Sequence, residues 1–219
     1  MRAELLLLVT GWFLLGCTGS PDADADIAVG SERPNATIAL PSEGQPLIGT
    51  AAPEWAENGW LAGGPLALGD LRGRVVLVRF FTNTCPFCAA SMPALEGLHE
   101  RYRASGLTVV GFYHPKPFGT DRSDDSVRAL LDDWGVTFPI ALDTEWSTLR
   151  RYWLDGGARL ATSASFLIDR EGTIRYLHPG PELHPDGAAC NLDATECARH
   201  YRELEHAIRV LTAQRPAPR

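Results

Sequence analysis

The chain has 219 residues and carries 27 acidic against 20 basic side chains, which gives a formal net charge of −7. This acidic balance argues against nucleic acid or an anionic membrane surface as a partner, because both are bound through basic patches. Any contact with a membrane is therefore expected to be made by a lipid attached to the protein.

The first 17 residues are interpreted as an export signal of the lipoprotein type. The apolar run at 5–15 is too short to span a bilayer as a helix and has the length of a signal-peptide core. It ends in Leu-Leu-Gly-Cys17, which resembles a bacterial lipobox, where the cysteine is lipidated and becomes the first residue of the mature chain. The alternative interpretation is an ordinary cleaved signal peptide in which Cys17 occurs by chance. Both interpretations predict export, and the first places the protein on the periplasmic face of a bacterial membrane.

Low-complexity segments bracket a single expected domain. Residues 18–45 are rich in Asp, Ala, Ser, Pro and Gly and show no hydrophobic periodicity, so we expect a disordered tether. Residues 214–219 are expected to form a disordered tail. The intervening 46–213 have the length of one ordinary domain.

Strand-like and helix-like patterns alternate along this domain. Apolar and β-branched runs predict strands at 75–81, 107–113, 138–142, 165–169 and 173–178. Apolar residues at helical spacing predict helices at 86–104, 123–134 and 143–153, and a last one that begins near 194 behind the capping pair Asp193 and Glu196. The strands at 165–169 and 173–178 are expected to form a hairpin. The alternation predicts an α/β fold.

Cys85 and Cys88 are spaced C-x-x-C at the junction between the strand at 75–81 and the helix after it. At the first turn of a helix both sulfurs lie on one side, where unsatisfied N–H groups and the helix dipole stabilise a thiolate. We therefore expect Cys85 to attack a substrate and the more buried Cys88 to resolve the mixed disulfide. No cofactor beyond this redox-active disulfide is required.

A zinc site and an inert structural disulfide are the two alternatives for this motif. Zinc would need two further ligands at finger or ribbon spacing, and the other candidates, Cys190 and Cys197, are separated by six residues. A C-x-x-C beside a βαβ pattern favours redox chemistry over both. No metal is therefore expected.

Several of these motifs together resemble the thioredoxin superfamily, specifically its exported TlpA/ResA-like branch. The resemblance implies a thioredoxin-like three-layer fold, a mixed central sheet flanked by helices. It also implies a membrane-tethered thiol–disulfide oxidoreductase that reduces disulfides of exported proteins, with those proteins and an unidentified membrane electron donor as partners. The resemblance covers most of 46–213 and is carried by the C-x-x-C, Pro93 and the segments 68–81, 106–111 and 166–172.

Two departures from the family lie next to the cysteines. Thr84 stands where the family usually has Trp, which removes an apolar platform beside the substrate disulfide. Arg79 falls where thioredoxins carry a buried acid, and a cation there cannot be the general base. Arg79 either lowers the thiolate pKa by a favourable charge interaction or faces outward or pairs with a carboxylate. Pro86 and Phe87, between the two cysteines, also act on the redox potential.

Two further positions are expected to face the cysteines. Ser163 occupies the place of the family's cis-proline, and because a cis bond before a non-proline residue costs several kcal/mol, a trans bond is expected. The hydroxyls of Thr162 and Ser163 should lie beside Cys85, where they donate to a thiolate or complete a turn. His114, at the end of the 107–113 strand, either tunes a thiolate or, as we favour, is a solvated loop histidine.

A second cysteine pair follows a stretch rich in Pro, Gly and His at 179–190. On one helix, Cys190 and Cys197 would be separated by about 10.5 Å of rise, too far to bond. With a loop at 190–193 and a helix from about 194, bonding becomes possible, and an exported protein favours a structural disulfide. A relay pair that exchanges electrons with Cys85 and Cys88 is the alternative.

Two other functions stay open. A redoxin-type thiol peroxidase is the first, because Thr82-x-x-Cys85 fits half of the peroxiredoxin pattern, although Arg79 stands where the proline of that pattern is expected. A copper-binding chaperone is the second, since thiolates bind soft Cu(I), but related chaperones space their cysteines C-x-x-x-C. The direction of electron flow is not determined by these motifs.

Overall fold

The computed structural model describes residues 44–56, 59–120, 122–157, 159, 161–186, 188 and 190–214. Residues 1–43 lie outside the described residues, so the predictions about the export signal, Cys17 and most of the tether are not tested. Gly44, inside the segment predicted to be a tether, is buried, and Gln45 begins a short 3₁₀ helix, so the ordered structure starts before residue 46.

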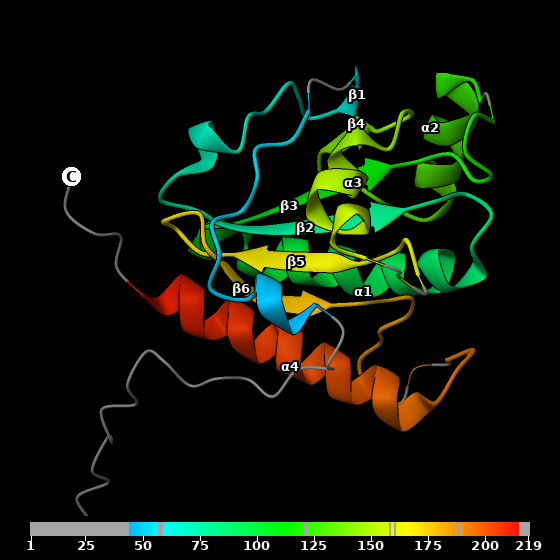
Figure 1. The fold of residues 1–219 in the computed structure, drawn as a ribbon. Coiled ribbons are helices and arrows are strands. Elements are labelled where there is room, and N and C mark those ends of the chain that lie inside the picture. Colours follow the sequence, from blue (N-terminus) through cyan, green and yellow to red (C-terminus); the bar gives the residue numbers. More distant parts are fainter. Residues whose placement is uncertain are drawn as a thin grey trace, which may run out of the picture. The chain divides into compact units, whose positions relative to one another are not determined.

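A six-stranded mixed sheet forms the middle layer of the domain, with strand order β1-β4-β3-β2-β5-β6 (Figure 1). The central strand β2 pairs in parallel with β3, β3 pairs in parallel with β4, and β1, β5 and β6 join antiparallel to their neighbours. The predicted α/β, thioredoxin-like three-layer fold is confirmed. The strands are β1 (Gly59–Ala62), β2 (Val75–Phe81), β3 (Leu107–Tyr113), β4 (Ile140–Leu142), β5 (Ser165–Ile168) and β6 (Ile174–His178).

Among the described residues, four α-helices cover the sheet, and the predicted starts of two of them are confirmed by their caps. The Ser123 hydroxyl accepts from Ser126 N, and the Asp193 carboxylate accepts from the N–H groups of Thr195 and Glu196, which are otherwise unsatisfied at a helix start. The helices are α1 (Pro86–Tyr102), α2 (Asp124–Asp133), α3 (Ser147–Tyr152) and α4 (Ala194–Ala213).

Two elements differ from the expectation. Helix α3 begins at Ser147 rather than near 143, because the buried Asp143 carboxylate accepts from the N–H groups of Thr148 and Leu149 and so occupies the turn before the helix. Strand β1 had not been predicted. It has four residues and belongs to the sheet through its pairing with β4, so its sequence alone carries too short a pattern to identify it.

Two apolar clusters lie on opposite faces of the sheet. One is packed under α1, α2 and α4, and the other under α3 and the segment before β2. Strand β2 is buried over its whole length and contributes to both, with Leu77 and Phe81 in the first cluster and Phe80 in the second. Since side chains alternate along a strand, Arg79 faces the same layer as Leu77 and Phe81, the layer that contains α1.

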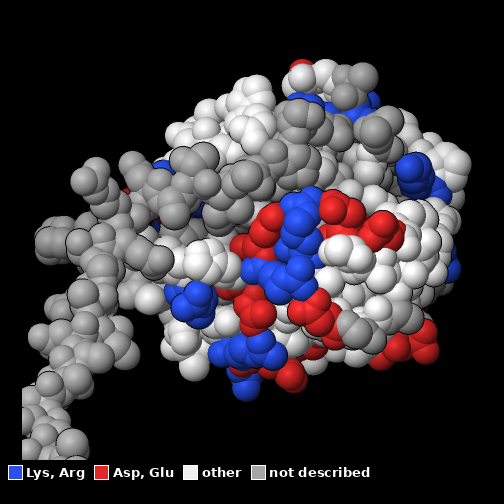
Figure 2. Space-filling view, turned by 90° about the horizontal axis from the view of Figure 1, so that it is seen from below, with Lys and Arg blue, Asp and Glu red and all other residues white. Residues whose placement is uncertain are grey.

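Helix α4 covers the lower side of the domain as drawn, and its outer face mixes charges of both signs (Figure 2). Arg199 pairs with Glu196 and Glu203, each at 2.6 Å, and Arg101 of α1 pairs with Glu205. Because opposite charges alternate, this face is not a basic patch of the kind that binds polyanions. None of the helices in the described parts of the chain is long and apolar enough to serve as a membrane span.

Candidate active site

The C-x-x-C cysteines lie where β2 ends and α1 begins, as predicted. Cys85 is the N-cap residue of α1, with an extended backbone, and Pro86 takes the first helical position, where its fixed φ favours helix initiation. Cys88 follows in the first turn, and its N–H donates to the Cys85 carbonyl at 3.0 Å. Both cysteines are free thiols, Cys85 half-buried and Cys88 fully buried. One sulfur is therefore accessible to a reactant while the other is shielded.

The two thiols differ in acidity in the direction that thiol exchange requires. Hydrogen bonding from the Cys88 side chain, helped by the backbone N–H groups of Cys88 and Phe87, lowers the pKa of Cys85 to about 5. The same hydrogen bond and burial raise the pKa of Cys88 well above its ordinary value. At neutral pH the accessible sulfur is a thiolate and the buried one keeps its proton.

Ser163 lies against the cysteine pair from the loop before β5. Its peptide bond is not among the cis bonds of the domain, so the trans prediction is confirmed. The Ser163 hydroxyl is 3.0 Å from the Cys88 sulfur and also lowers the pKa of Cys85. Ser163 therefore contacts Cys88, in addition to acting on Cys85 as expected.

His114 is not the solvated loop histidine that we favoured. Its ring is fully buried, edge-on to Trp146 with ring centroids 5.1 Å apart, and its Nε2 is 2.9 Å from Thr162 Oγ1. Burial lowers the pKa of His114 to about 3, so the imidazole is neutral at physiological pH. The sequence did not reveal that Trp146, about 30 residues later, covers this loop.

Arg79 neither faces outward nor pairs with a carboxylate, so that alternative is wrong. Its side chain is fully buried, with Nη1 3.2 Å from Ser165 Oγ and Nη2 2.7 Å from the Pro181 carbonyl. Burial lowers the pKa of Arg79, and the charges of Cys88 and Cys85 raise it. The guanidinium therefore interacts electrostatically with the cysteine pair, as the other alternative proposed.

The remaining predicted site residues surround the entrance to Cys85. Thr84 and Pro86 are exposed on either side of it, and Phe87 is half-buried at the start of α1. The residue that precedes the reactive cysteine is therefore an exposed threonine rather than a large aromatic residue.

A family model described as the AhpC/TSA family matches residues 48–177, more than half of the chain. The chain belongs to the AhpC/TSA family. It is 31% identical over 156 residues to Protein DipZ of Mycobacterium tuberculosis, an alignment that covers 67% of this chain and 21% of DipZ. It is 29% identical over 127 residues to the thiol-disulfide oxidoreductase ResA of Bacillus anthracis, covering 58% of this chain and 66% of ResA. The predicted resemblance to ResA-like proteins of the thioredoxin superfamily is confirmed.

A solved structure shares the fold of this AhpC/TSA family member. It is the solution structure of a putative protein disulfide isomerase from Bacteroides thetaiotaomicron, with a TM-score of 0.59 and 24% identity. The match covers 76% of this chain and 91% of the other. At this identity the likeness shows the fold alone.

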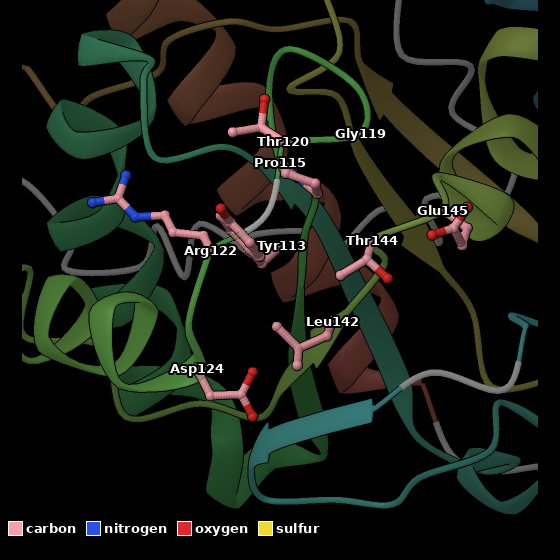
Figure 3. A pocket seen from close by; sticks show the side chains of 9 residues that line it. All are labelled: Tyr113, Pro115, Gly119, Thr120, Arg122, Asp124, Leu142, Thr144 and Glu145. Carbon is pink, nitrogen blue, oxygen red and sulfur yellow. The ribbon is translucent and has the colours of Figure 1, made fainter.

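A pocket of about 280 Å³ lies at the carboxyl ends of β3 and β4, within the region matched by the AhpC/TSA model (Figure 3). Arg122 and Glu145 line it with charged groups from opposite sides, and Tyr113 forms part of its wall. The Tyr113 hydroxyl donates to Asn83 Oδ1 at 3.0 Å, two residues before Cys85. The pocket therefore adjoins the segment that leads to the reactive cysteine.

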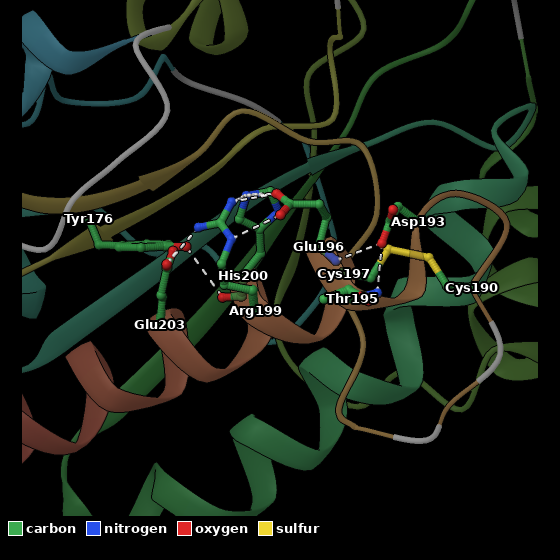
Figure 4. Close-up of polar contacts among 9 residues, drawn as sticks. All are labelled: Tyr176, Cys190, Asp193, Thr195, Glu196, Cys197, Arg199, His200 and Glu203. Atoms are coloured by element: carbon green, nitrogen blue, oxygen red, sulfur yellow. Dashed lines mark hydrogen bonds and ion pairs between the residues drawn. A yellow bond between two sulfur atoms is a disulfide. The ribbon is translucent and has the colours of Figure 1, made fainter.

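The second cysteine pair lies beyond the AhpC/TSA match, and the structure joins Cys190 and Cys197 in a disulfide (Figure 4). Cys197 is in the first turn of α4, and Cys190 belongs to the loop before the helix, which is the arrangement that the spacing required. Glu182, buried beside this disulfide, accepts from His184 Nε2 at 2.7 Å and from Asn191 N at 3.1 Å. Its carboxylate joins the two ends of the loop that precedes α4.

No sequence pattern singles out Glu182 or His184. A lone acid in a Pro-rich stretch has no periodic pattern, so only the folded loop shows that the two side chains pair. Glu182 and the two sulfurs lie within 4.8 Å of one another, the spacing of metal ligands. In the structure, however, the two sulfurs are bonded to each other rather than free to ligate.

Replacing both Cys190 and Cys197 by alanine is expected to lower the free energy of unfolding by about 2 kcal/mol, because the bond closes a short loop of the unfolded chain. Urea denaturation of the variant and the unchanged protein, without reductant, measures this. A structural disulfide leaves exchange activity per folded molecule unchanged. Loss of activity in a folded variant would instead support the relay alternative.

Proposed function

We propose that this protein is a thiol–disulfide oxidoreductase that acts through Cys85 and Cys88. The observation that carries the proposal is the asymmetry of the pair, an accessible cysteine with a pKa of about 5 beside a buried one with a raised pKa. The printed name of ResA, a thiol-disulfide oxidoreductase, supports it. No cofactor is needed, because the cysteine pair itself carries the two electrons as a dithiol and releases them when it forms the disulfide.

The exchange proceeds in two displacements. In the reducing direction, the Cys85 thiolate attacks one sulfur of a substrate disulfide, the substrate S–S bond breaks, and the other substrate sulfur leaves as a thiolate. Cys88 then loses its proton and attacks Cys85, which forms the Cys85–Cys88 disulfide and releases the substrate dithiol. The oxidising direction is the reverse. The Ser163 hydroxyl, 3.0 Å from the Cys88 sulfur, stabilises the charge that develops there.

We further propose that the partners are thiols or disulfides of exported proteins and a membrane-bound redox partner, and that the protein is tethered by a lipid on Cys17. The apolar run before Cys17 supports this, and a disulfide such as Cys190–Cys197 persists in oxidising compartments outside the cytoplasm.

A Cys17→Ala variant is expected to move the protein from the membrane fraction to the soluble fraction of exported proteins, because it removes the lipidated residue. Immunoblotting of fractionated cells measures the shift. A variant that stays with the membrane would contradict the lipid anchor.

The proposed function is tested by incubating the full chain in glutathione buffers of graded redox ratio, followed by alkylation and peptide mass mapping. A reversible Cys85–Cys88 disulfide is the expected result. Failure to form one at any ratio would exclude the oxidoreductase.

The peroxidase alternative is tested in parallel by peroxide consumption, and the copper alternative by Cu(I) titration. The Thr82 hydroxyl, which the peroxiredoxin pattern would place in the reaction, lies 3.4 Å from Asn83 Oδ1. No contact among the described residues favours either alternative over thiol exchange.

A further inference from the structure

Arg79 is a fully buried cation without an acidic partner among the described residues. Two of its hydrogen bonds go to neutral acceptors, Ser165 Oγ and the Pro181 carbonyl, a further one goes to the Cys88 side chain, and its Nε atom has no partner. Burying a guanidinium without a compensating anion is costly, and structures that tolerate it supply a counter-charge. A group near Arg79 is therefore expected to carry a negative charge.

The polar groups around Arg79 leave the cysteines as the candidates. Strand register places Arg79, Ser165 and His178 next to one another across β2, β5 and β6 (Figure 1). Burial lowers the pKa of His178 and of His114 below the ordinary value, so both imidazoles are neutral. Glu182 follows Pro181 in the chain, but its carboxylate is bound by His184 and Asn191.

The charges that act on Arg79 are those of the active-site sulfurs. Interaction with Cys88 and then with Cys85 raises the pKa of Arg79 against the effect of burial, and Arg79 in turn lowers the pKa of Cys88. In the dithiol form one of these sulfurs is a thiolate and compensates the guanidinium. In the disulfide form both sulfurs are neutral, and the guanidinium loses its anion.

The loop at 179–193 holds the guanidinium in this place. The Pro181 carbonyl accepts from Arg79 Nη2, and two residues later Leu183 N donates to Ser91 Oγ, one turn beyond Cys88 in α1. The Glu182 contacts fix the same loop. Ser165 of β5 and Pro181 of this loop therefore position Arg79, and α1 holds the loop in place through Ser91.

We propose that Arg79 is a positioning residue that stabilises the thiolate form of the Cys85–Cys88 pair over its disulfide, and so makes that disulfide an oxidant of client dithiols. This inference rests on the proposed function and sets the direction of its electron flow, opposite to the reduction that the family resemblance implied. A disulfide becomes a stronger oxidant when its reduced form is stabilised.

The oxidising reaction balances without an added reactant. A client thiolate attacks Cys85, the Cys85–Cys88 bond breaks, and Cys88 leaves as a thiolate next to Arg79. The second client thiolate then attacks the client sulfur of the mixed disulfide and releases Cys85 as a thiolate. The client loses two electrons and two protons. The protein gains the electrons, one proton binds Cys88, and the other goes to solvent.

The test compares Arg79→Met, which removes the charge, with Arg79→Lys, which keeps it. At a fixed glutathione ratio, the ratio of dithiol to disulfide at Cys85–Cys88 is expected to fall at least tenfold in Arg79→Met, a potential more negative by about 30 mV. Arg79→Lys is expected to retain most of the unchanged protein's value. Alkylation and peptide mapping report on this pair separately from Cys190–Cys197.

Arg74→Met is the matched control. Arg74 precedes β2 at the end opposite the cysteines, where it donates to Thr108 Oγ1 and the Leu107 carbonyl. Removing its charge should leave the potential unchanged. An equal shift in Arg74→Met and Arg79→Met, or none in Arg79→Met, would overturn the inference while leaving the proposed function intact. Absence of a reversible pair in the unchanged protein would instead remove the proposed function.

A second measurement needs no variant, should Arg79→Met fail to fold. If the disulfide leaves Arg79 without its anion, the unchanged protein should melt at a higher temperature with Cys85–Cys88 reduced than with the pair oxidised. Both samples keep the Cys190–Cys197 bond, as mass mapping verifies. Higher stability of the oxidised form would contradict the inference.

Discussion

Replacing Cys85 by serine is expected to reduce the rate of disulfide exchange by at least about a thousandfold, because a serine hydroxyl is not ionised at neutral pH and forms no mixed disulfide. Cys85 is the accessible thiol of the pair and the one with the lowered pKa. Exchange with a small disulfide-bonded peptide, followed by chromatography of the products, measures this rate.

Cys88→Ser is the matched variant, because it removes the second thiol and keeps the first. Its Cys85 should still attack, but the mixed disulfide should persist, since no buried thiol remains to resolve it. The trapped species is identified by mass spectrometry. Rapid turnover in Cys85→Ser, or mixed disulfides on Cys88 instead of Cys85, would refute the assigned order of attack.

The reaction of Cys85 with dithiodipyridine is expected to be half-maximal near pH 5 and flat above about pH 6. The sign follows from the ionisation, because the thiolate is the reacting form and a lower pKa keeps it populated in acid. At pH 5 about half of Cys85 is thiolate, against about one part in ten thousand for a thiol at the ordinary value of 9.0.

Lower basicity also weakens the nucleophile. A four-unit drop in pKa lowers the intrinsic reactivity of a thiolate by about 60-fold. The two effects nearly cancel at pH 7, where Cys85 should react about as fast as an ordinary thiol, and leave an advantage of about a hundredfold at pH 5. The rate of reaction with dithiodipyridine therefore distinguishes Cys85 from an ordinary thiol at about pH 5, but not at pH 7.

The same protein unfolded in urea is the control for this profile. Its cysteines should titrate near their ordinary pKa and react negligibly at pH 5. A half-maximal rate near pH 8 or 9 in the folded protein would show that the helix start and the Cys88 hydrogen bond do not stabilise the thiolate.

The strands and the redox motif were accessible from the sequence because they depend on local patterns. Strand β2 is a continuous apolar run, and its junction with a helix at a C-x-x-C needs only neighbouring residues to be recognised. The disulfide between Cys190 and Cys197 was also accessible, since its feasibility depends on where one helix begins.

The surroundings of the cysteines were decided by tertiary contacts. Arg79 is held in the interior by the Pro181 carbonyl, 102 positions later in the chain, and His114 packs against Trp146, 32 positions later. No sequence pattern links Pro181 or Trp146 to the site.

The sequence by itself therefore determined the α/β order of elements, the position of the reactive pair and the helix start that activates it, because hydrophobic periodicity and helix capping act over a few residues. Only the tertiary structure decided which groups lie against that pair, a serine hydroxyl and a buried guanidinium. Burial and charge compensation depend on segments that come together only when the sheet and its loops are packed.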